Sequence, residues 1–439
     1  MALEWYEFGA IMFACLFILL MIGIPVGFSL LITAMGSSLF LGQGVKFFAD
    51  FPGYFFHHLN SFEFTCVPLF ILMAVLAQKA GFGEDLFRSL GLWLRRVPGS
   101  LNTVSVTACA IFAAISGTSV ATAASIGLIA VPILKKYGYE KRLSSGAIAA
   151  GGALGILIPP SVPMIMYCII TDQSIGKMFA GGILPGIMTA VIFIGYIMIR
   201  CKLKPELAPV ISREAVGNIS TARSILNVVP LFSIILLILV SMYGGFTTAT
   251  EAAAVGCIGV GILAIIYRRL NLLQMFKASL DAMRVGAFIT LIFLSAIIFG
   301  HVAARGGVGA GLSDLVIGLG LSKYAVLLIM LGVMVILGCF MDPVPIILTT
   351  MPIFYPIATS FGFNPIFFGV ISVMTLETAA ITPPVGINLF VLSGIAKDYV
   401  KMGDIIRGAF PFVLLYFLAI AIVIMFPDII TYLPNTMTK

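Results

Sequence analysis

The segments GILIPP, residues 155–160, and AAITPP, residues 379–384, decide the fold, because each places two consecutive prolines inside a long apolar stretch. The proline pairs lie 224 residues apart (383 − 159 = 224). A gap-free shift by the same 224 residues also aligns other turns and breaks: Pro132-Ile133 with Pro356-Ile357, Tyr137-Gly138-Tyr139 with Phe361-Gly362-Phe363, and Lys177-Met178 with Lys401-Met402. An internal repeat of this length predicts that the chain contains two copies of one structural unit.

The composition places both copies in a membrane. Of the 439 residues, 61% are hydrophobic and only 10% are charged, with a mean hydropathy of +1.15. Soluble domains average about 45–50% apolar and about 25% charged residues. The apolar stretches are also much longer than the roughly 10-residue strands of a membrane barrel. The composition therefore excludes a soluble enzyme and a porin, and predicts an all-α integral membrane protein.

The first unit, expected at residues 1–215, contains two elements that do not cross the membrane simply. The apolar pair at 103–134 is split at Ser116-Gly117-Thr118-Ser119 and is flanked by basic residues on both sides. Each half is shorter than the roughly 20 residues that cross a bilayer as a helix. We therefore predict a re-entrant hairpin that enters and leaves on one side, followed by a broken helix at 143–172.

The second unit, expected at residues 225–439, repeats both elements. Its hairpin is predicted at 324–358 and its broken helix at 365–396. With each hairpin counted as re-entrant, each unit crosses the membrane five times, and an odd number of crossings turns the second unit upside down. The expected fold is an inverted repeat of two five-span units.

The distribution of positive charge predicts the orientation. Twenty of the 25 Lys and Arg residues fall on the side that holds segments 81–102, 135–142, 200–228, 268–284 and 397–407. The other side holds only five: Lys46, Lys177, Arg305, Lys323 and Lys439. Because positive residues collect in cytoplasmic loops, both termini are expected to face outward, away from the cytoplasm. The basic stretches at 84–97 and 268–284 are expected to lie along the cytoplasmic interface.

The helix breaks and hairpin tips are the expected binding sites. A proline removes a backbone donor and displaces the carbonyl four residues earlier, so the proline pairs free carbonyls near 155–158 and 379–382. Such carbonyls can bind cations. The SGTS tip adds hydroxyl oxygens, and the returning half-helix offers unpaired amides to an anion. This combination is typical of a secondary-transport site; the alternative is that the prolines only kink their helices and that SGTS is a packing surface.

Few ionisable residues lie deep in the apolar segments. Asp342, at the second hairpin tip, can compensate a cation or only cap the returning half-helix. Glu377 can accept hydrogen bonds from backbone amides or take up a proton. Asn388 can offer its amide to a carboxylate or satisfy the broken helix. Together with Ser119, we expect Asp342 and Asn388 to contact an acidic substrate.

Enzymatic functions are disfavoured, because the sequence has no G-x-S-x-G, H-E-x-x-H or nucleotide-binding P-loop motif. No organic cofactor and no nucleic-acid partner are expected. A channel is also disfavoured, since the hairpins carry no ring-forming selectivity segment. Transport would then draw its energy from an ion gradient or a partner.

Four strings carry a family resemblance: SGTSVATAASIGLIAVPILKKYGY (116–139), GALGILIPPSVPMIMY (152–167), GCFMDPVPIILTTMPIFYPIA (338–358) and ETAAITPPVGINLFV (377–391). They resemble the large membrane subunit of tripartite ATP-independent periplasmic (TRAP) transporters. The resemblance implies a sodium-driven, elevator-type carrier in the bacterial inner membrane. It further implies a small four-helix membrane subunit and a soluble periplasmic binding protein that delivers an organic acid such as a dicarboxylate, a keto acid or sialic acid.

The resemblance also implies two sodium sites. By motif, one uses Ser116, Thr118, Gly155, Ile158 and Pro160, and the other uses Gly338, Ala379, Thr382 and Val385. Na⁺ is the only metal expected. The sequence thus predicts a sodium-coupled symporter of small organic acids. The alternative is a carrier of similar fold acting alone, as a dicarboxylate symporter or a proton-coupled antiporter.

Overall fold

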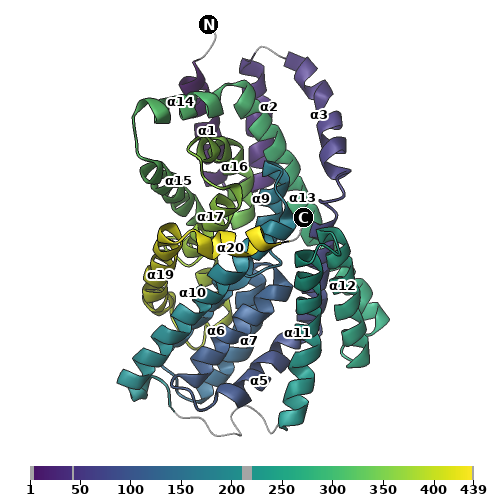
Figure 1. The fold of residues 1–439 in the computed structure, drawn as a ribbon, viewed down its shortest axis with the longest axis vertical. Helices are drawn as coiled ribbons and strands as arrows, with labels where there is room; N and C mark the ends of the chain where they lie inside the picture. Colours follow the sequence, from purple (N-terminus) through teal and green to yellow (C-terminus); the bar gives the residue numbers. More distant parts are fainter. Residues whose placement is uncertain (1–3, 42–43, 210–219, 438–439) are drawn as a thin grey trace.

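A computed structural model describes residues 4–41, 44–209 and 220–437, and these residues contain helices but no strands (Figure 1). The first half contains α1 (Trp5–Met21), α2 (Val26–Phe40), α3 (Gly44–Leu59), α4 (Cys66–Lys79), α5 (Phe82–Leu94), α6 (Ser100–Ser116), α7 (Ser119–Lys136), α8 (Lys141–Ala153), the short 3₁₀ helix η1 (Leu154–Ile156), α9 (Val162–Thr171) and α10 (Ile175–Leu203). A second 3₁₀ helix, η2 (Pro205–Leu207), follows.

The second half contains α11 (Thr221–Tyr243), α12 (Ala249–Ile266), α13 (Leu272–Arg305), α14 (Val308–Gly318), α15 (Lys323–Gly338), α16 (Pro343–Ser360), α17 (Pro365–Ala380), α18 (Ile387–Ile395), α19 (Met402–Met425) and α20 (Asp428–Thr436). The expected boundary between the units, at residues 215–225, lies partly outside the described residues, as do Arg213 and Lys439 of the charge count.

The two halves match element by element at the predicted shift. Adding 224 to the limits of α7, 119 and 136, gives 343 and 360, which are the limits of α16. The same shift carries the first residue of α8, 141, to 365, the first residue of α17. It carries α9, 162–171, to 386–395, within one residue of α18. The predicted fold is confirmed: an inverted repeat in which each unit has a hairpin and a helix broken at a Pro-Pro pair.

One expectation about the repeat is wrong. The basic stretch at 268–284 is not a separate interfacial segment, because α13 runs without interruption from Leu272 to Arg305. Its counterpart in the first half is divided into α3 and α4. There the turn at Asn60-Ser61 ends α3, and the Ser61 hydroxyl accepts a hydrogen bond from the Phe64 amide. The matching residues 284 and 285 (60 + 224 and 61 + 224) are Arg and Val, which provide no such turn.

Three further helices, α3, α14 and α20, were not predicted from the sequence. The first-half basic stretch, in contrast, is the separate helix α5. It turns by 63° from α4 at Gly81, whose φ of 74° is in the left-handed region that favours glycine.

Seven described helices are long and apolar enough to span a membrane, or eight if the bent pair α4 and α5 forms one span. Two of the seven, α7 and α16, are the returning halves of the hairpins. In Figure 1 the first hairpin, α6 and α7, lies at the lower end of the molecule and the second, α15 and α16, at the upper end. The hairpins therefore approach the centre from opposite ends, as an inverted repeat requires.

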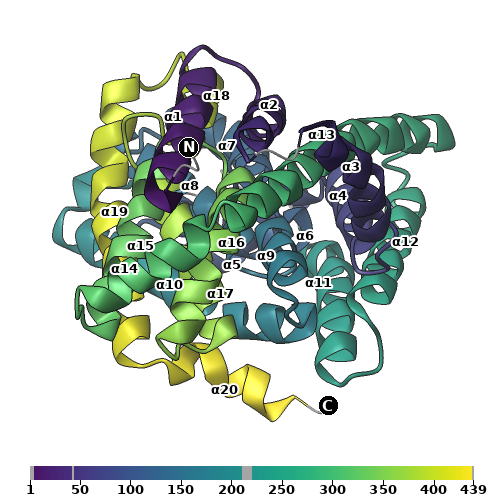
Figure 2. The same ribbon diagram turned by 90° about the horizontal axis from the view of Figure 1, so that it is seen from above.

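Two groups of helices are visible from above (Figure 2). Helices α3, α4 and α12 lie beside α13 on one side, and α15, α17 and α19 lie on the other. Helix α8 of the first half and helix α19 of the second nearly touch: a Cβ on Gly146 would lie 2.1 Å from the Gly408 carbonyl oxygen. Glycines on facing helices permit this approach, and they join the two halves into one packed body.

Candidate functional site

The first hairpin tip is a tight turn closed by its own hydroxyls. Gly117 has a φ of 60°, which lets α6 end and α7 begin within two residues. The Ser116 hydroxyl lies 3.3 Å from the Thr118 carbonyl oxygen and also hydrogen-bonds the Thr122 hydroxyl. The Thr122 hydroxyl in turn donates to the Thr118 carbonyl at 2.8 Å. Three oxygens from Ser116, Thr118 and Thr122 are thus gathered at one point.

The first broken helix packs directly against this tip. A Cβ on Gly155 would lie 2.5 Å from the Thr118 carbonyl oxygen, so only glycine fits there. The Val162 amide donates to the Gly117 carbonyl at 3.3 Å. The Pro160 carbonyl oxygen would lie 3.1 Å from a Cβ on Gly117. The structure therefore brings together four of the five residues predicted for the first sodium site, and the fifth, Ile158, lies in the same break with its side chain beside Gly186.

The second tip and break meet in a similar way. A Cβ on Gly338 would lie 2.5 Å from the Ala379 Cβ, so the end of α15 is pressed against α17. The Thr382 hydroxyl donates to the Thr378 carbonyl at 2.6 Å. Val385 is half-buried in the break between α17 and α18. The Cys339 thiol, which the sequence analysis did not select, lies 3.6 Å from the Pro383 carbonyl oxygen and ties the tip to the break.

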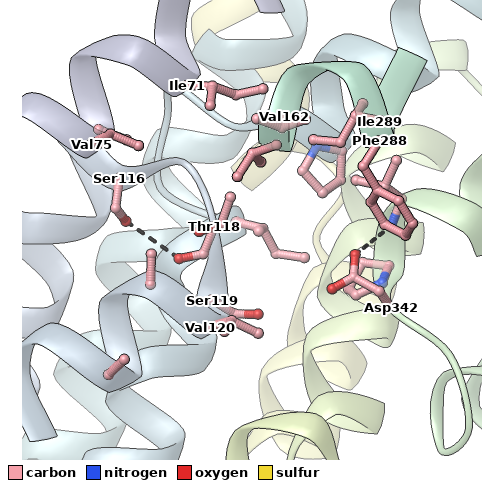
Figure 3. Close-up of a pocket in the computed structure, with 18 of the residues that line it drawn as sticks. Ile71, Val75, Ser116, Thr118, Ser119, Val120, Val162, Phe288, Ile289 and Asp342 are labelled. Carbon is pink, nitrogen blue, oxygen red and sulfur yellow. Dashed lines mark hydrogen bonds between the residues drawn. The ribbon is translucent and has the colours of Figure 1, made fainter. Parts of the chain in front are cut away.

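A cavity of about 490 Å³ separates the two tips (Figure 3). Figure 3 shows Ser116, Thr118 and Ser119 on one side and Asp342 on the other. The volume of the cavity lies in the range of small-molecule sites, about 300–1,000 Å³. Apolar side chains of α4 and α13 form much of its wall: Ile71, Ala74, Val75, Val285, Phe288, Ile289 and Ile292. This wall and Gln78 could not be predicted from the sequence, because α4 and α13 contain no break that singles them out.

Helices α7 and α16 both begin at the cavity, but only α16 has a charged side chain at its N-terminus. The Asp342 carboxylate caps α16 by accepting from the Val344 amide at 3.2 Å. In α7, no side chain caps the N-terminus, and the first residues, Ser119, Val120 and Ala121, line the cavity. Uncapped amides at a helix N-terminus attract anions. The described lining contains no Lys or Arg, so the α7 end is its anion-attracting element and Asp342 its negative one.

Glu377 joins the two breaks and does not line the cavity. It is fully buried, and its Oε1 accepts a hydrogen bond from the Ile156 amide at 2.9 Å. This is the backbone-amide role expected for Glu377, but the amide belongs to the opposite repeat. The second oxygen, Oε2, has no hydrogen-bond partner among the described residues.

Asn388 lies outside the cavity, unlike Ser119 and Asp342. It is fully buried, and neither its amide nitrogen nor its oxygen is hydrogen-bonded within the described part of the chain. Its role as a substrate contact stays a prediction.

Residues 13–429 match the family model described as "Tripartite ATP-independent periplasmic transporter, DctM component". The chain belongs to the DctM family. It is 33% identical over 385 residues to the C4-dicarboxylate TRAP transporter large permease protein DctM of Pseudomonas aeruginosa, covering 87% of this chain and 88% of that one. It is 28% identical to the sialic acid TRAP transporter permease protein SiaT of Haemophilus influenzae, over 95% of this chain and 67% of that one.

The fold has a solved counterpart in the YdaH transporter of Alcanivorax borkumensis, with a TM-score of 0.64, 14% identity and coverage of 88% and 90% of the two chains.

Membership of the DctM family identifies a multi-pass secondary transporter that works with a periplasmic binding protein. The family also implies a small membrane subunit and an inner-membrane location, and its curated members named here are permeases, not enzymes.

Proposed function

We propose that this DctM-family chain imports a small organic acid in symport with sodium, after a periplasmic binding protein delivers the acid. The supporting observation is that one cavity lies between two hairpin tips, each packed against a broken helix of its own repeat. Oxygens at the tips and breaks would hold the sodium ions. The uncapped N-terminus of α7 would receive the acid.

The charges in the cavity explain why sodium would be required. An acid entering the cavity meets helix amides on one side and the Asp342 carboxylate on the other. Sodium bound first would supply the positive charge that the described lining lacks. By linkage, the acid would then tighten sodium binding by the same factor.

The wall of the cavity supports an elevator movement. One side consists of α4 and α13, and the other of hairpin tips and a broken helix. An ion pair between Lys79 and Asp281 joins α4 to α13, and a second, between Asp85 and Arg269, joins α5 to the segment that precedes α13. In the proposed movement α4 and α13 stay fixed, while both hairpins, the broken helices and the substrate move along their apolar side chains.

Further elements of the proposal concern partners and orientation. A small four-helix membrane subunit would be a partner of this chain, and both termini would be periplasmic, as the 20-to-5 distribution of basic residues supports. The names of the relatives favour a C4-dicarboxylate or sialic acid, and a keto acid is the third class. The binding protein would dock on the periplasmic face.

The test begins with thermal unfolding of the purified chain in sodium chloride against choline chloride at constant ionic strength. A ligand at about 30 times its Kd stabilises the folded state by roughly 2 kcal/mol. A saturable, sodium-specific rise in the midpoint is expected. Proteoliposomes with the small subunit and binding protein would then take up labelled acid only with an inward sodium gradient.

The alternative, a stand-alone or proton-driven carrier, makes opposite predictions for these proteoliposomes. The buried, half-satisfied carboxyl of Glu377 is the observation in its favour. Uptake without the binding protein, or uptake driven by a pH gradient with no response to sodium, would replace the proposed function with this alternative.

A further inference from the structure

A second large cavity lies away from the transport site, at the base of the first hairpin. Its volume is about 680 Å³. It lies between the end of α5, the beginning of α6, the turn between α7 and α8, and the end of α10. These elements meet at the lower end of Figure 1, on the face that carries most of the basic residues of the sequence.

Three cations line this cavity. Arg95 and Arg96 follow α5, and Lys202 lies in the last turn of α10. No acidic side chain within residues 4–41, 44–209 and 220–437 forms an ion pair with any of the three. Elsewhere on this face, by contrast, Arg88, Arg142 and Arg269 are each paired with a carboxylate. Three cations around one cavity, none of them ion-paired to a described residue, favour the binding of an anion there.

The floor of the cavity supplies hydrogen-bond donors. Helix α6, 17 residues long, begins there at Ser100, and no side chain caps it. Ser100, the first residue of the helix, lines the cavity, and no side chain caps its amide. The next amide, that of Leu101, makes a long contact of 3.5 Å to the Tyr139 hydroxyl. The Ser100 hydroxyl lies 3.1 Å from the same phenol. Burial raises the pKa of Tyr139, which keeps the phenol neutral and able to donate.

The backbone at Gly99 is tightly constrained by its conformation and by its neighbours. Gly99 has a φ of 69°, and a Cβ on it would lie 2.8 Å from the Cys201 sulfur and from the Ile197 side chain. The start of α6 is thus pressed onto the end of α10. This contact holds the α6 amides and Lys202 at one opening.

We propose that this cavity binds the phosphate group of an anionic phospholipid from the membrane leaflet on the basic face. Guanidinium and ammonium groups combined with helix amides are the usual partners of phosphate in proteins. Basic pockets between membrane helices on the cytoplasmic side bind such headgroups. The bound phosphate would link the α5–α6 connection to α10 and so fasten the base of the first hairpin.

The experiment compares two variants, each of which loses three positive charges. The cavity variant is Arg95→Gln, Arg96→Gln, Lys202→Gln. The control variant is Lys136→Gln, Lys141→Gln, Arg223→Gln, whose exposed side chains do not line the cavity. Each protein is placed in nanodiscs of phosphatidylcholine with increasing phosphatidylglycerol, and its unfolding midpoint is followed. A separate series in pure phosphatidylcholine adds inorganic phosphate against chloride at constant ionic strength.

A saturable rise with phosphatidylglycerol is expected for the wild type and the control variant. In the cavity variant the apparent lipid affinity should fall on the order of 100-fold, because three cations near the headgroup are lost. An equal lipid response in both variants overturns the proposal. A response to inorganic phosphate without one to phosphatidylglycerol overturns the lipid as the source. If the triple variant does not fold, the single exposed substitution Arg96→Gln is measured in the same way, with Lys141→Gln as its control.

Discussion

The carboxylate of Glu377 accepts a hydrogen bond from the amide of Ile156 at 2.9 Å, and this bond links the broken helices of the two repeats. Ile156 lies at the end of η1, where the Pro159-Pro160 break interrupts the helix. Glu377 lies in the last turn of α17, just before the second break. A backbone amide beside one break thus donates to a side chain beside the other, and such bonds help an interrupted helix to persist inside a membrane.

Glu377→Ala removes a carboxylate acceptor from the buried Ile156 amide. The expected cost is about 1–3 kcal/mol, seen as a lower unfolding midpoint of the purified protein. Glu377→Gln keeps an oxygen acceptor and should recover most of the loss. If the Ala variant unfolds at the wild-type midpoint, the bond does not contribute to stability, and the link between the breaks has no energetic role.

Gly155→Ala tests the contact between the first break and the first tip. The added Cβ would lie 2.5 Å from the Thr118 carbonyl oxygen, a backbone atom that cannot swing away. Overpacking of this kind costs about 1–3 kcal/mol, and displacement of the tip should also abolish the sodium-dependent rise in the unfolding midpoint.

Gly195→Ala in α10 is the matched control, because a Cβ there has nothing within 4 Å. Alanine stabilises a helix interior by up to about 1 kcal/mol over glycine, so this variant should unfold no earlier than the wild type. A full sodium response in Gly155→Ala would show that the tip does not hold the ion.

Gly338→Ala makes the equivalent test at the second tip. The added Cβ would lie 2.5 Å from the Ala379 Cβ and push α15 away from α17. We expect a loss of about 1–3 kcal/mol and a weaker response to sodium. Gly332→Ala, on the same helix, has open space around it and should unfold no earlier than the wild type, with the wild-type sodium response. If both variants show the same sodium-dependent rise in the unfolding midpoint, Gly338 does not contribute to the second sodium site.

The repeat could be predicted because prolines and glycines interrupt both halves at the same positions. Gly117 likewise predicts the turn at the first tip, and Pro160 and Pro384 predict the two helix breaks. The Glu377–Ile156 bond could not be predicted, since residue 153 (377 − 224), the counterpart of Glu377, is Ala and shows no pairing. The cavity wall was missed for a related reason: Phe288 and its neighbours on α13 look like any lipid-facing helix until the fold places them opposite the hairpin tips.

Asp342 offers the last prediction, because capping and charge can be separated at this residue. Its carboxylate accepts from the Val344 amide at the start of α16, and asparagine caps helices as well as aspartate does. Asp342→Asn should therefore keep the unfolding midpoint in choline chloride but require roughly tenfold more sodium for half of the sodium-dependent rise. Asp342→Ala should lose the cap as well, at about 1 kcal/mol. If the Asn variant keeps the wild-type sodium titration while the Ala variant alone is destabilised, Asp342 acts only as a cap, and the negative charge in the cavity takes no part in sodium binding.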